Sequence, residues 1–321
     1  MAYFRCGGNG NTIMIDGQEY DDDLNLKSGS AIEADFQLPT MNARFAYDNC
    51  AVVLNNEIHM LGGINVGNQH YKYSNGAWKK VGNLPGSFVN GSAVVFNGEI
   101  YIFGIQTYTN TYTGVAKYNG STWVTLDSSP IDTSCSCAVV FRNKIHILGG
   151  KQYNLHYTFD GKTWSRFSTL PYEFRNGCAV VLNGKDGEEI HILGSDGFDG
   201  ELTSTMSAHY AYKWVDQTGI SGGYEWVRVS TLPYKFYNGC AVVLNNEIHI
   251  LGGDGNVVNN STICSRSQHY IYSGERWKIL KILPWEMHRS CAVVLNDNIY
   301  AMSTSELNKF SIIYGKFFTK L

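Results

Sequence analysis

The chain has 321 residues, of which 17% are charged, and its formal net charge is −3. This near balance gives no basic surface of the kind that attracts nucleic acids or anionic membranes, so we expect neither as a partner. No segment approaches about 18 consecutive apolar residues, as a transmembrane helix requires, and the N-terminus lacks the basic start and apolar core of a secretion signal. We therefore expect a cytoplasmic or virion-associated protein without membrane insertion.

Residues 1–30 differ from the rest of the chain. Thr12–Ile15 followed by Asp16-Gly17 predicts a short hairpin, and the acidic run Asp21–Asp23 comes next. The opening residues, MAYFRCGG, resemble the starts of phage tail proteins from Gram-positive hosts. We interpret residues 1–30 as an attachment segment that joins the protein to a larger assembly.

From residue 31 to residue 321 we expect a single domain, because one unit is written six times. The stretch NCAVVLNNEIHMLGG at positions 49–63 returns with small changes at 91–104, 136–150, 177–194, 239–253 and 290–302. Each copy predicts an apolar strand, a turn such as Asn55-Asn56 that tolerates positive φ, and a second strand with alternating apolar residues. Three of the copies end in a Gly-Gly pair, where the backbone can turn sharply.

Two further strands are expected in each unit. The third, such as His70–Tyr73, is followed by a turn such as Asn75-Gly76, and the fourth begins at a Trp. Five Trp residues each precede a Pro by seven positions, and each Pro precedes the next copy's first strand by another seven: Trp78, Trp123, Trp164, Trp226 and Trp277. Four antiparallel strands in each of six units predict an all-β fold, a six-bladed β-propeller.

The closure of this ring has two candidate strands. Residues 317–321 align with the fourth strand of the sixth unit. Residues 32–39 also resemble the end of a fourth strand, because Leu38-Pro39 matches Leu170-Pro171. The sequence leaves open which of the two segments completes the last blade.

The units are similar to the Kelch repeat, in which a hydrophobic strand ends in Gly-Gly and a Tyr is followed seven residues later by a Trp. The matching pairs are Tyr71 and Trp78, Tyr157 and Trp164, and Tyr270 and Trp277. Copy two departs with Ala116 in place of the Tyr, and copy six has Phe310 and Phe317 at the two positions. Over residues 50–321 the resemblance implies a Kelch-type propeller, a family that includes both binding modules and enzymes.

The recurring His and Cys residues belong to the repeat, so we assign them structural roles. Eight of the nine His occupy two equivalent positions, which we interpret as polar strand ends, and His288 alone stands outside them. Five Cys share one position, where copy two has Ser92. This regularity favours small buried side chains in a reducing compartment over disulfides or metal ligands. We expect no cofactor, no metal site and no catalytic residue.

Candidate binding residues lie in the loops that lead into the first strand of each unit. Aromatic and basic side chains are frequent there, and they supply contact area at low entropic cost. The predicted ligand-binding residues are Arg44, Tyr47, Phe88, Tyr172, Phe174, Arg175, Tyr234, Phe236, Tyr237, Trp285, His288 and Arg289. We expect these loops to share one face with the variable loops at 106–113, 195–207 and 254–267.

The sequence favours a non-catalytic binding module that recognises a protein or a glycan through this variable-loop face, as a component of a phage or prophage tail or attachment structure. The alternative is a sugar-processing enzyme of the sialic-acid mutarotase-like Kelch class, with an Arg such as Arg175 or Arg289 beside an acidic residue such as Glu173 or Glu286. A pocket at the channel mouth where an Arg and an acidic residue converge would favour that alternative. A structural spacer is the third interpretation.

Overall fold

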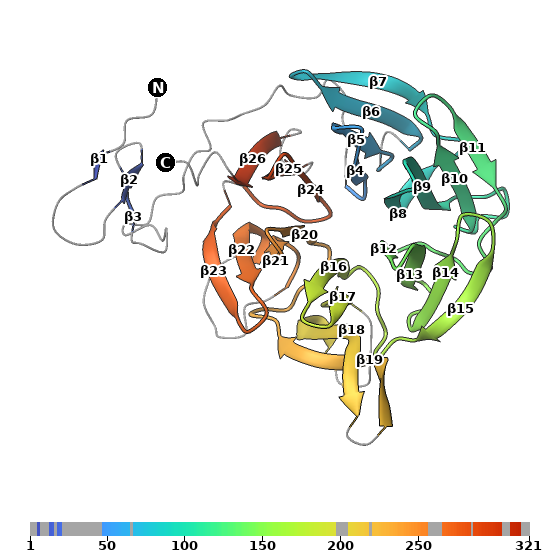
Figure 1. The fold of residues 1–321 in the computed structure, drawn as a ribbon. Coiled ribbons are helices and arrows are strands. Elements are labelled where there is room, and N and C mark those ends of the chain that lie inside the picture. Colours follow the sequence, from blue (N-terminus) through green and yellow to red (C-terminus); the bar gives the residue numbers. More distant parts are fainter. Residues whose placement is uncertain are drawn as a thin grey trace.

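The computed structural model describes residues 5–6, 13–15, 18–20, 47–64, 67–196, 205–217, 220–255, 265–283, 285–303 and 309–315. Six antiparallel sheets surround a central axis as the blades of a propeller (Figure 1). Five blades have four strands, and the sixth has three strands within the described residues. The predicted six-bladed β-propeller is therefore confirmed. Both candidates for the last strand, 317–321 and 32–39, lie outside the described residues.

Within each blade the strands run outward from the axis in chain order. Blade 1 consists of β4 (Cys50–Leu54), β5 (Glu57–Leu61), β6 (Gln69–Ser74) and β7 (Ala77–Asn83). Blade 2 consists of β8 (Phe88–Phe96), β9 (Glu99–Ile105), β10 (Gly114–Tyr118) and β11 (Trp123–Leu126). Blade 3 consists of β12 (Ser136–Phe141), β13 (Lys144–Gly149), β14 (Leu155–Phe159) and β15 (Trp164–Thr169). Blade 4 consists of β16 (Cys178–Gly184), β17 (Gly187–Leu193), β18 (Ala208–Gln217) and β19 (Ile220–Thr231). Blade 5 consists of β20 (Cys240–Leu244), β21 (Glu247–Leu251), β22 (Gln268–Tyr272) and β23 (Trp277–Ile282). Blade 6 contains β24 (Cys291–Leu295), β25 (Asn298–Ser303) and β26 (Lys309–Gly315). Short 3₁₀ turns at Thr205–Ser207 and Ser265–Ser267 precede β18 and β22.

The innermost strands β4, β8, β12, β16, β20 and β24 each contact the next one around the axis, and β24 contacts β4, so the ring is closed. The turns between the first two strands take the expected left-handed conformation. Asn55 and Asn56, for example, have φ of 51° and 62°, as a type I′ hairpin requires.

Neighbouring blades are joined by the Gly-Gly pairs. Gly149 has φ of 65°, and a Cβ placed on it would overlap the carbonyl oxygen of Phe174 in the next blade. The next residue, Gly150, donates its N–H to the same oxygen at 2.8 Å. Gly63 and Gly253 make the same bond to Phe88 and Met287. The pair therefore permits a close backbone approach that a side chain would prevent.

The hydrophobic core is divided into six clusters, each between two neighbouring blades. Between blades 6 and 1, for example, Ile58 and Met60 of β5 pack against Val293 and Leu295 of β24. Full burial of one such side chain contributes about 1.5–3 kcal/mol. Small residues stand at the hub and the Trp and Tyr rings stand farther out, as the sequence predicted.

Eight His residues form four buried pairs, one in each of blades 1, 3, 4 and 5. The nitrogen–nitrogen distances are 2.8 Å for His59–His70, His146–His156 and His191–His209, and 2.9 Å for His249–His269. In blade 1, Trp123 of the next blade donates its indole N–H to His70 at 3.2 Å. The structural role is correct, but the interpretation as polar strand ends is wrong, because these side chains are at most 2% exposed.

Residues Arg5–Cys6, Ile13–Ile15 and Gln18–Tyr20 form β1, β2 and β3, a separate three-stranded sheet. Strands β2 and β3 pair antiparallel with Ile15 opposite Gln18, as the predicted hairpin requires. Figure 1 shows this sheet outside the ring of blades. Among the described residues, no helix has the length and apolar content that crossing a bilayer demands.

Candidate binding site at the channel mouth

Six main-chain hydrogen bonds form a closed circle at the mouth of the central channel. They join one residue from each blade, which together we call the hub ring: Asp48, Asn90, Cys135, Asn176, Asn238 and Arg289. Each N–H donates to the hub-ring carbonyl of the preceding blade, at distances of 2.6–3.2 Å. The circle includes the bond from Asp48 to Arg289, which joins the first blade to the last.

All six hub-ring residues have positive φ, between 48° and 67°. Asn and Asp tolerate this conformation better than other residues with a side chain, which accounts for four of the six positions. Cys135 and Arg289 adopt it at a higher conformational cost. All six blades therefore share the left-handed backbone conformation at this position, although the side chains differ.

The recurring Cys residues form a second circle directly below the hub ring. The thiol of Cys50 donates to the carbonyl of Gly91 at 2.9 Å, and Cys137 donates to Gly177 at 3.1 Å. Cys178, Cys240 and Cys291 also donate to the following blade. Burial raises the pKa of Cys50 and Cys137 to about 12, so the thiols stay protonated and act as donors. Among the described residues, no group of three His, Cys, Asp or Glu is placed to hold a metal ion.

A cavity of about 240 Å³ opens at this mouth and is open to solvent. Its wall contains the hub ring, the recurring thiols and a lower ring of six Ala: Ala51, Ala93, Ala138, Ala179, Ala241 and Ala292. Amide and carboxylate groups thus surround the entrance, and methyl groups line the deeper part. This arrangement suits a small polar group of a ligand that enters from the mouth face.

The residue immediately before each hub-ring position varies from blade to blade, and only Tyr occurs twice among the six. We call these six the crown positions: Tyr47, Val89, Ser134, Arg175, Tyr237 and His288. The carbonyl groups of Tyr47, Ser134, Arg175 and Tyr237 each accept an N–H from a loop of their own blade. The main chain is therefore fixed by equivalent bonds, while the side chain above it varies.

Two Asp residues each join a hub-ring Asn to an Arg, which is the crown residue Arg175 in one blade and Arg266 in the next. The carboxylate of Asp196 accepts the Arg175 Nε–H at 2.8 Å and the Asn176 amide at 2.8 Å. In the next blade, Asp254 accepts the Asn238 amide at 3.1 Å and the Nε–H of Arg266 at 2.8 Å. Arg266 also lies 3.5 Å from the carboxylate of Glu286, whereas Arg175 has further N–H groups beyond the one that Asp196 accepts.

Aromatic contacts complete this face. Tyr47 and His288, from the first and last blades, have ring centroids 5.0 Å apart. The guanidinium of Arg175 lies 5.5 Å from the ring centroid of Tyr153, within the range of a cation–π contact. Burial and the nearby Arg266 lower the pKa of His288, so this ring is neutral near pH 7.

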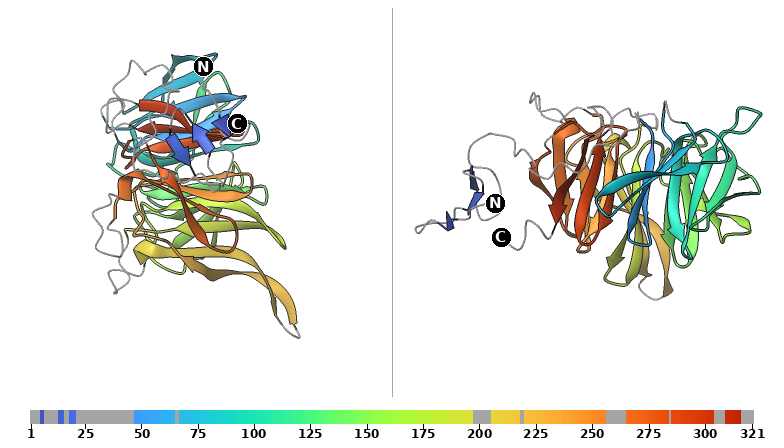
Figure 2. Two further views of the ribbon diagram at one scale, coloured as in Figure 1. Left: turned by 90° about the vertical axis from the view of Figure 1, so that its left-hand side faces the viewer. Right: turned by 90° about the horizontal axis from the view of Figure 1, so that it is seen from above.

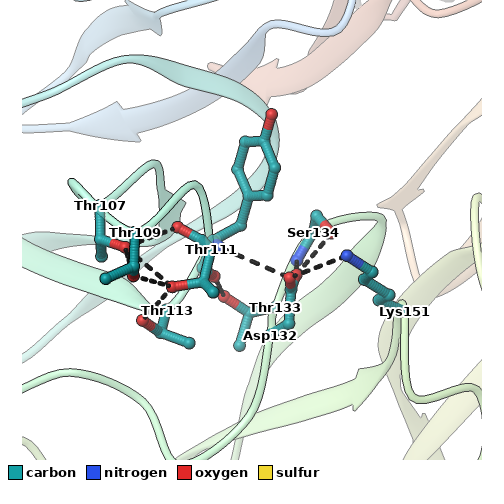
Figure 3. Close-up of polar contacts among 9 residues, drawn as sticks. Thr107, Thr109, Thr111, Thr113, Asp132, Thr133, Ser134 and Lys151 are labelled. Atoms are coloured by element: carbon teal, nitrogen blue, oxygen red, sulfur yellow. Dashed lines mark hydrogen bonds and ion pairs between the residues drawn. The ribbon is translucent and has the colours of Figure 1, made fainter.

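A threonine-rich loop stands on the same face in the sector of blades 2 and 3 (Figure 3). Thr107, Thr109, Thr111 and Thr113 follow β9 at alternate positions, and their hydroxyls form a chain of hydrogen bonds of 2.8–3.3 Å. Tyr108 between them is fully exposed. Nearby, Asp132 accepts from Ser134 and lies 3.5 Å from the ammonium of Lys151. The loop thus presents hydroxyl groups and one aromatic ring to solvent.

The predicted binding residues fall into two groups in the structure. Tyr47, Arg175, Tyr237, His288 and Arg289 surround the mouth, in crown or hub-ring positions. Phe88, Tyr172, Phe174, Tyr234, Phe236 and Trp285 are instead at most 8% exposed and belong to the inter-blade clusters. The expectation that these six project to a ligand is corrected, because their loops pass beneath the glycine that follows the second strand of the preceding blade, which is Gly62, Gly149, Gly194 or Gly252. Arg44 lies outside the described residues.

The hub ring and its two carboxylate partners, Asp196 and Asp254, were not predicted from the sequence. A signal was present, since an Asn or Asp stands two residues before the Cys or Ser of four copies. The recurrence of Asn or Asp at this place in the repeat indicates a position where the backbone takes positive φ. The carboxylates could not be found in this way, because they lie in loops of different length.

Comparison with known proteins supports the fold. A family model described as the DUF6242 beta propeller domain matches residues 74–176, less than half of the chain. Among solved structures, the one titled "Structure of YjhT" superposes with a TM-score of 0.65 and 15% sequence identity, covering 85% of this chain and 95% of that one. At this identity the likeness shows the propeller fold alone. No curated protein sequence matches the chain.

Proposed function

We propose that this propeller, of the Kelch type, is a non-catalytic binding module that recognises a protein or a glycan with its mouth face. The observation that carries the proposal is the contrast between the hub ring and the crown positions. The six crown positions each stand directly before a hub-ring residue, and four of them accept the same main-chain bond, yet the six carry Tyr, Val, Ser, Arg, Tyr and His. A purely structural repeat gives no reason for such variety directly above a uniform ring.

The chemistry of this face favours a polar ligand. Tyr237, Arg175 and His288 combine flat contact area with hydrogen-bonding groups, a composition typical of binding hot spots. The Asp partner of Arg175 orients the guanidinium before a ligand arrives, which lowers the entropic cost of binding. The threonine hydroxyls and Tyr108 extend the same surface outward.

The test is a glycan-array screen together with a pull-down from the native source, followed by affinity measurements on the ligand found. Replacing Arg175 and Tyr237 together with Ala should weaken binding by at least about tenfold, with little change in melting temperature. Arg166→Ala, at an exposed site on β15, is the matched control and should bind as the wild type does. An unchanged affinity in the double variant would remove the ligand from the mouth.

The attachment role of residues 1–30 is part of this proposal. Their resemblance to the starts of phage tail proteins supports a place in a virion or prophage assembly. A chain lacking residues 1–30 should keep ligand binding but no longer co-purify with the assembly of the native source. Co-purification of the shortened chain at the wild-type level would contradict the attachment role.

One observation favours a second candidate, a sugar-processing enzyme of the mutarotase-like kind. At the mouth cavity, Arg289 lies 3.4 Å from the carboxylate of Asp48, so a basic and an acidic residue converge there. Burial raises the pKa of Asp48, and interchange of sugar anomers needs a group that can give a proton to the ring oxygen. Exchange spectroscopy on reducing sugars tests this candidate. Anomer exchange that is accelerated by the wild type and lost in Asp48→Asn would replace the non-catalytic interpretation.

A further inference from the structure

Among the described strands, those of the β18–β19 hairpin extend far past their counterparts in the other blades. The two strands have 10 and 12 residues, whereas β22 and β23 of the next blade have five and six. Figures 1 and 2 show this hairpin, which forms the outer half of blade 4, projecting from the ring. Because each innermost strand starts at the channel mouth, the turns between third and fourth strands lie at the opposite end of the blades. The hairpin is thus remote from the candidate site above.

Four aromatic side chains follow one face of this hairpin. Trp226, Tyr212, Tyr224 and Trp214 have successive ring-centroid distances of 5.4, 5.5 and 5.7 Å. The inner end packs against Phe141 of blade 3, with 6.3 Å between the Phe141 and Tyr212 rings. The outer end reaches solvent, where Trp214 is 36% exposed. The stripe is therefore anchored in the core between blades 3 and 4 and ends on an open ring.

Trp214 is held in place although it is exposed. Its indole N–H donates to the Asp216 carboxylate at 2.8 Å. A Cβ on Gly222 of the opposite strand would lie 2.8 Å from Cε2 of Trp214, so the indole rests directly on this glycine. Tyr224 meets the indole with its rings inclined by 68°. A ring fixed on three sides binds a ligand without losing rotamer freedom, which is an advantage that a mobile surface Trp lacks.

The groups beside the stripe are polar and carry charges of both signs. The guanidinium of Arg142, from the turn between β12 and β13, lies 3.8 Å from the ring centroid of Tyr224. Asp216 supplies one negative charge near Trp214, and one of its oxygens is not used by the indole. The Glu188 carboxylate also accepts the main-chain N–H of Arg142 at 3.4 Å, so charges of both signs stand close together here. Such a mixture favours an uncharged partner over an ionic one. The surface thus offers an aromatic face with a hydrogen-bond donor and acceptor beside it.

We propose that Trp214, Tyr224, Asp216 and Arg142 form a second binding site, which takes a neutral oligosaccharide. The C–H face of a pyranose ring is apolar and stacks on the open face of the indole, while its hydroxyls donate to Asp216 and accept from Arg142. The inference is independent of the ligand at the channel mouth, because the two sites share no residue.

The full chain is titrated calorimetrically with cellohexaose, maltohexaose and chitohexaose in turn. We expect at least one of them to bind, and we expect Trp214→Ala to weaken that binding by about tenfold or more, with Trp214→Tyr recovering most of it. Gly222→Val keeps the indole but displaces it, together with the Val215 carbonyl that a Cβ at this position also meets, and should weaken binding to a similar extent. Ile279→Ala, at an exposed position on β23, is the matched control.

Each contrary outcome is informative. Binding that survives Trp214→Ala and Gly222→Val overturns the second site, and so does the absence of binding by all three sugars. Binding that is lost in the Arg175 and Tyr237 double variant but kept in Trp214→Ala assigns the sugar to the channel mouth. Loss of binding in Trp214→Ala alone supports the hairpin site whatever becomes of the mouth proposal. Circular dichroism and melting curves exclude misfolded variants.

Discussion

The N–H of Asp48 donates to the carbonyl oxygen of Arg289 at 3.1 Å, and the guanidinium of Arg289 lies 3.4 Å from the carboxylate of Asp48. The two residues are 241 positions apart, so this pair joins the first and last blades at the hub. Closure of the ring therefore depends partly on main-chain atoms at the axis, in addition to packing of β24 on β4.

Replacing Asp48 with Val should destabilise the protein by about 1–3 kcal/mol. The backbone there has φ of 67°, which a β-branched residue adopts only with strain, and the ion pair to Arg289 is also lost. Asp48→Asn keeps the backbone preference and is the control. Urea unfolding measures both variants, and equal stability of the Val and Asn variants would show that the hub ring does not constrain φ.

Replacing Gly149 with Ala should cost more than replacing Gly76 with Ala. Both glycines have positive φ, so both variants carry backbone strain of about 1 kcal/mol. Only at Gly149 does the new methyl overlap the Phe174 carbonyl, whereas nothing lies within 4 Å of a Cβ at Gly76. The difference in unfolding free energy between the two variants isolates the close approach of blades 3 and 4. A difference near zero would contradict it.

The hub thiols should react slowly in the folded protein. Burial raises the pKa of Cys50 and Cys137 to about 12 and of Cys135 to about 11, and the thiolate is the reactive form. Labelling with a thiol reagent at about pH 8, followed by peptide mass mapping, should therefore leave these three unmodified in the native state and modify them after denaturation. Rapid native labelling of Cys137 would mean that its thiol is neither buried nor hydrogen-bonded as described.

Stability should fall as the pH is lowered from about 6.5 toward 4. Burial lowers the pKa of His146 to about 4, and it lowers the pKa of His156 well below its usual value. Below the unfolded pKa of about 6.5, the unfolded chain binds protons that the folded protein does not, so the folded state is fully stable only above that value. Each such His then lowers the unfolding free energy by up to about 1.4 kcal/mol per pH unit.

Urea unfolding at about pH 7.5, 6 and 5 tests this dependence. His156→Gln should unfold more easily at every pH, but its stability should change less steeply with pH, because one proton-binding group is gone. His288→Gln, at a less buried site, should keep most of the wild-type slope. A wild-type stability that does not change between pH 7.5 and 5 would contradict neutral, buried His pairs.

The blades were predicted well because the same turn residues recur at equivalent positions in the repeats. Asn55-Asn56 and its counterparts and the Gly-Gly pairs appear where expected, and β11, β15 and β23 begin at their Trp, since each depends on local conformation or spacing. An exception is β19, which begins at Ile220, before Trp226. The His pairs could not be predicted in the same way. His146 and His156 meet diagonally across β13 and β14, and this contact depends on strand register, which the separate residues do not reveal.

The candidate site was predicted only in part, for a physical reason. Phe174 and Arg175 are neighbours in one loop, yet the first is fully buried and the second stands at the mouth. The loop must pass beneath Gly149 and Gly150, and this contact with another blade decides which side chain points inward. Composition identified the loop as important, but it could not separate the two roles.

The circle of main-chain bonds at the hub lies beside the six crown positions, which surround one opening. Because the hub-ring bonds use main-chain atoms only, and because no crown residue has positive φ, a crown side chain can be exchanged without rebuilding the blade below. Such a frame lends itself to diversification, by mutation in nature or by a combinatorial library in the laboratory, in the manner of a recognition scaffold with six addressable sites.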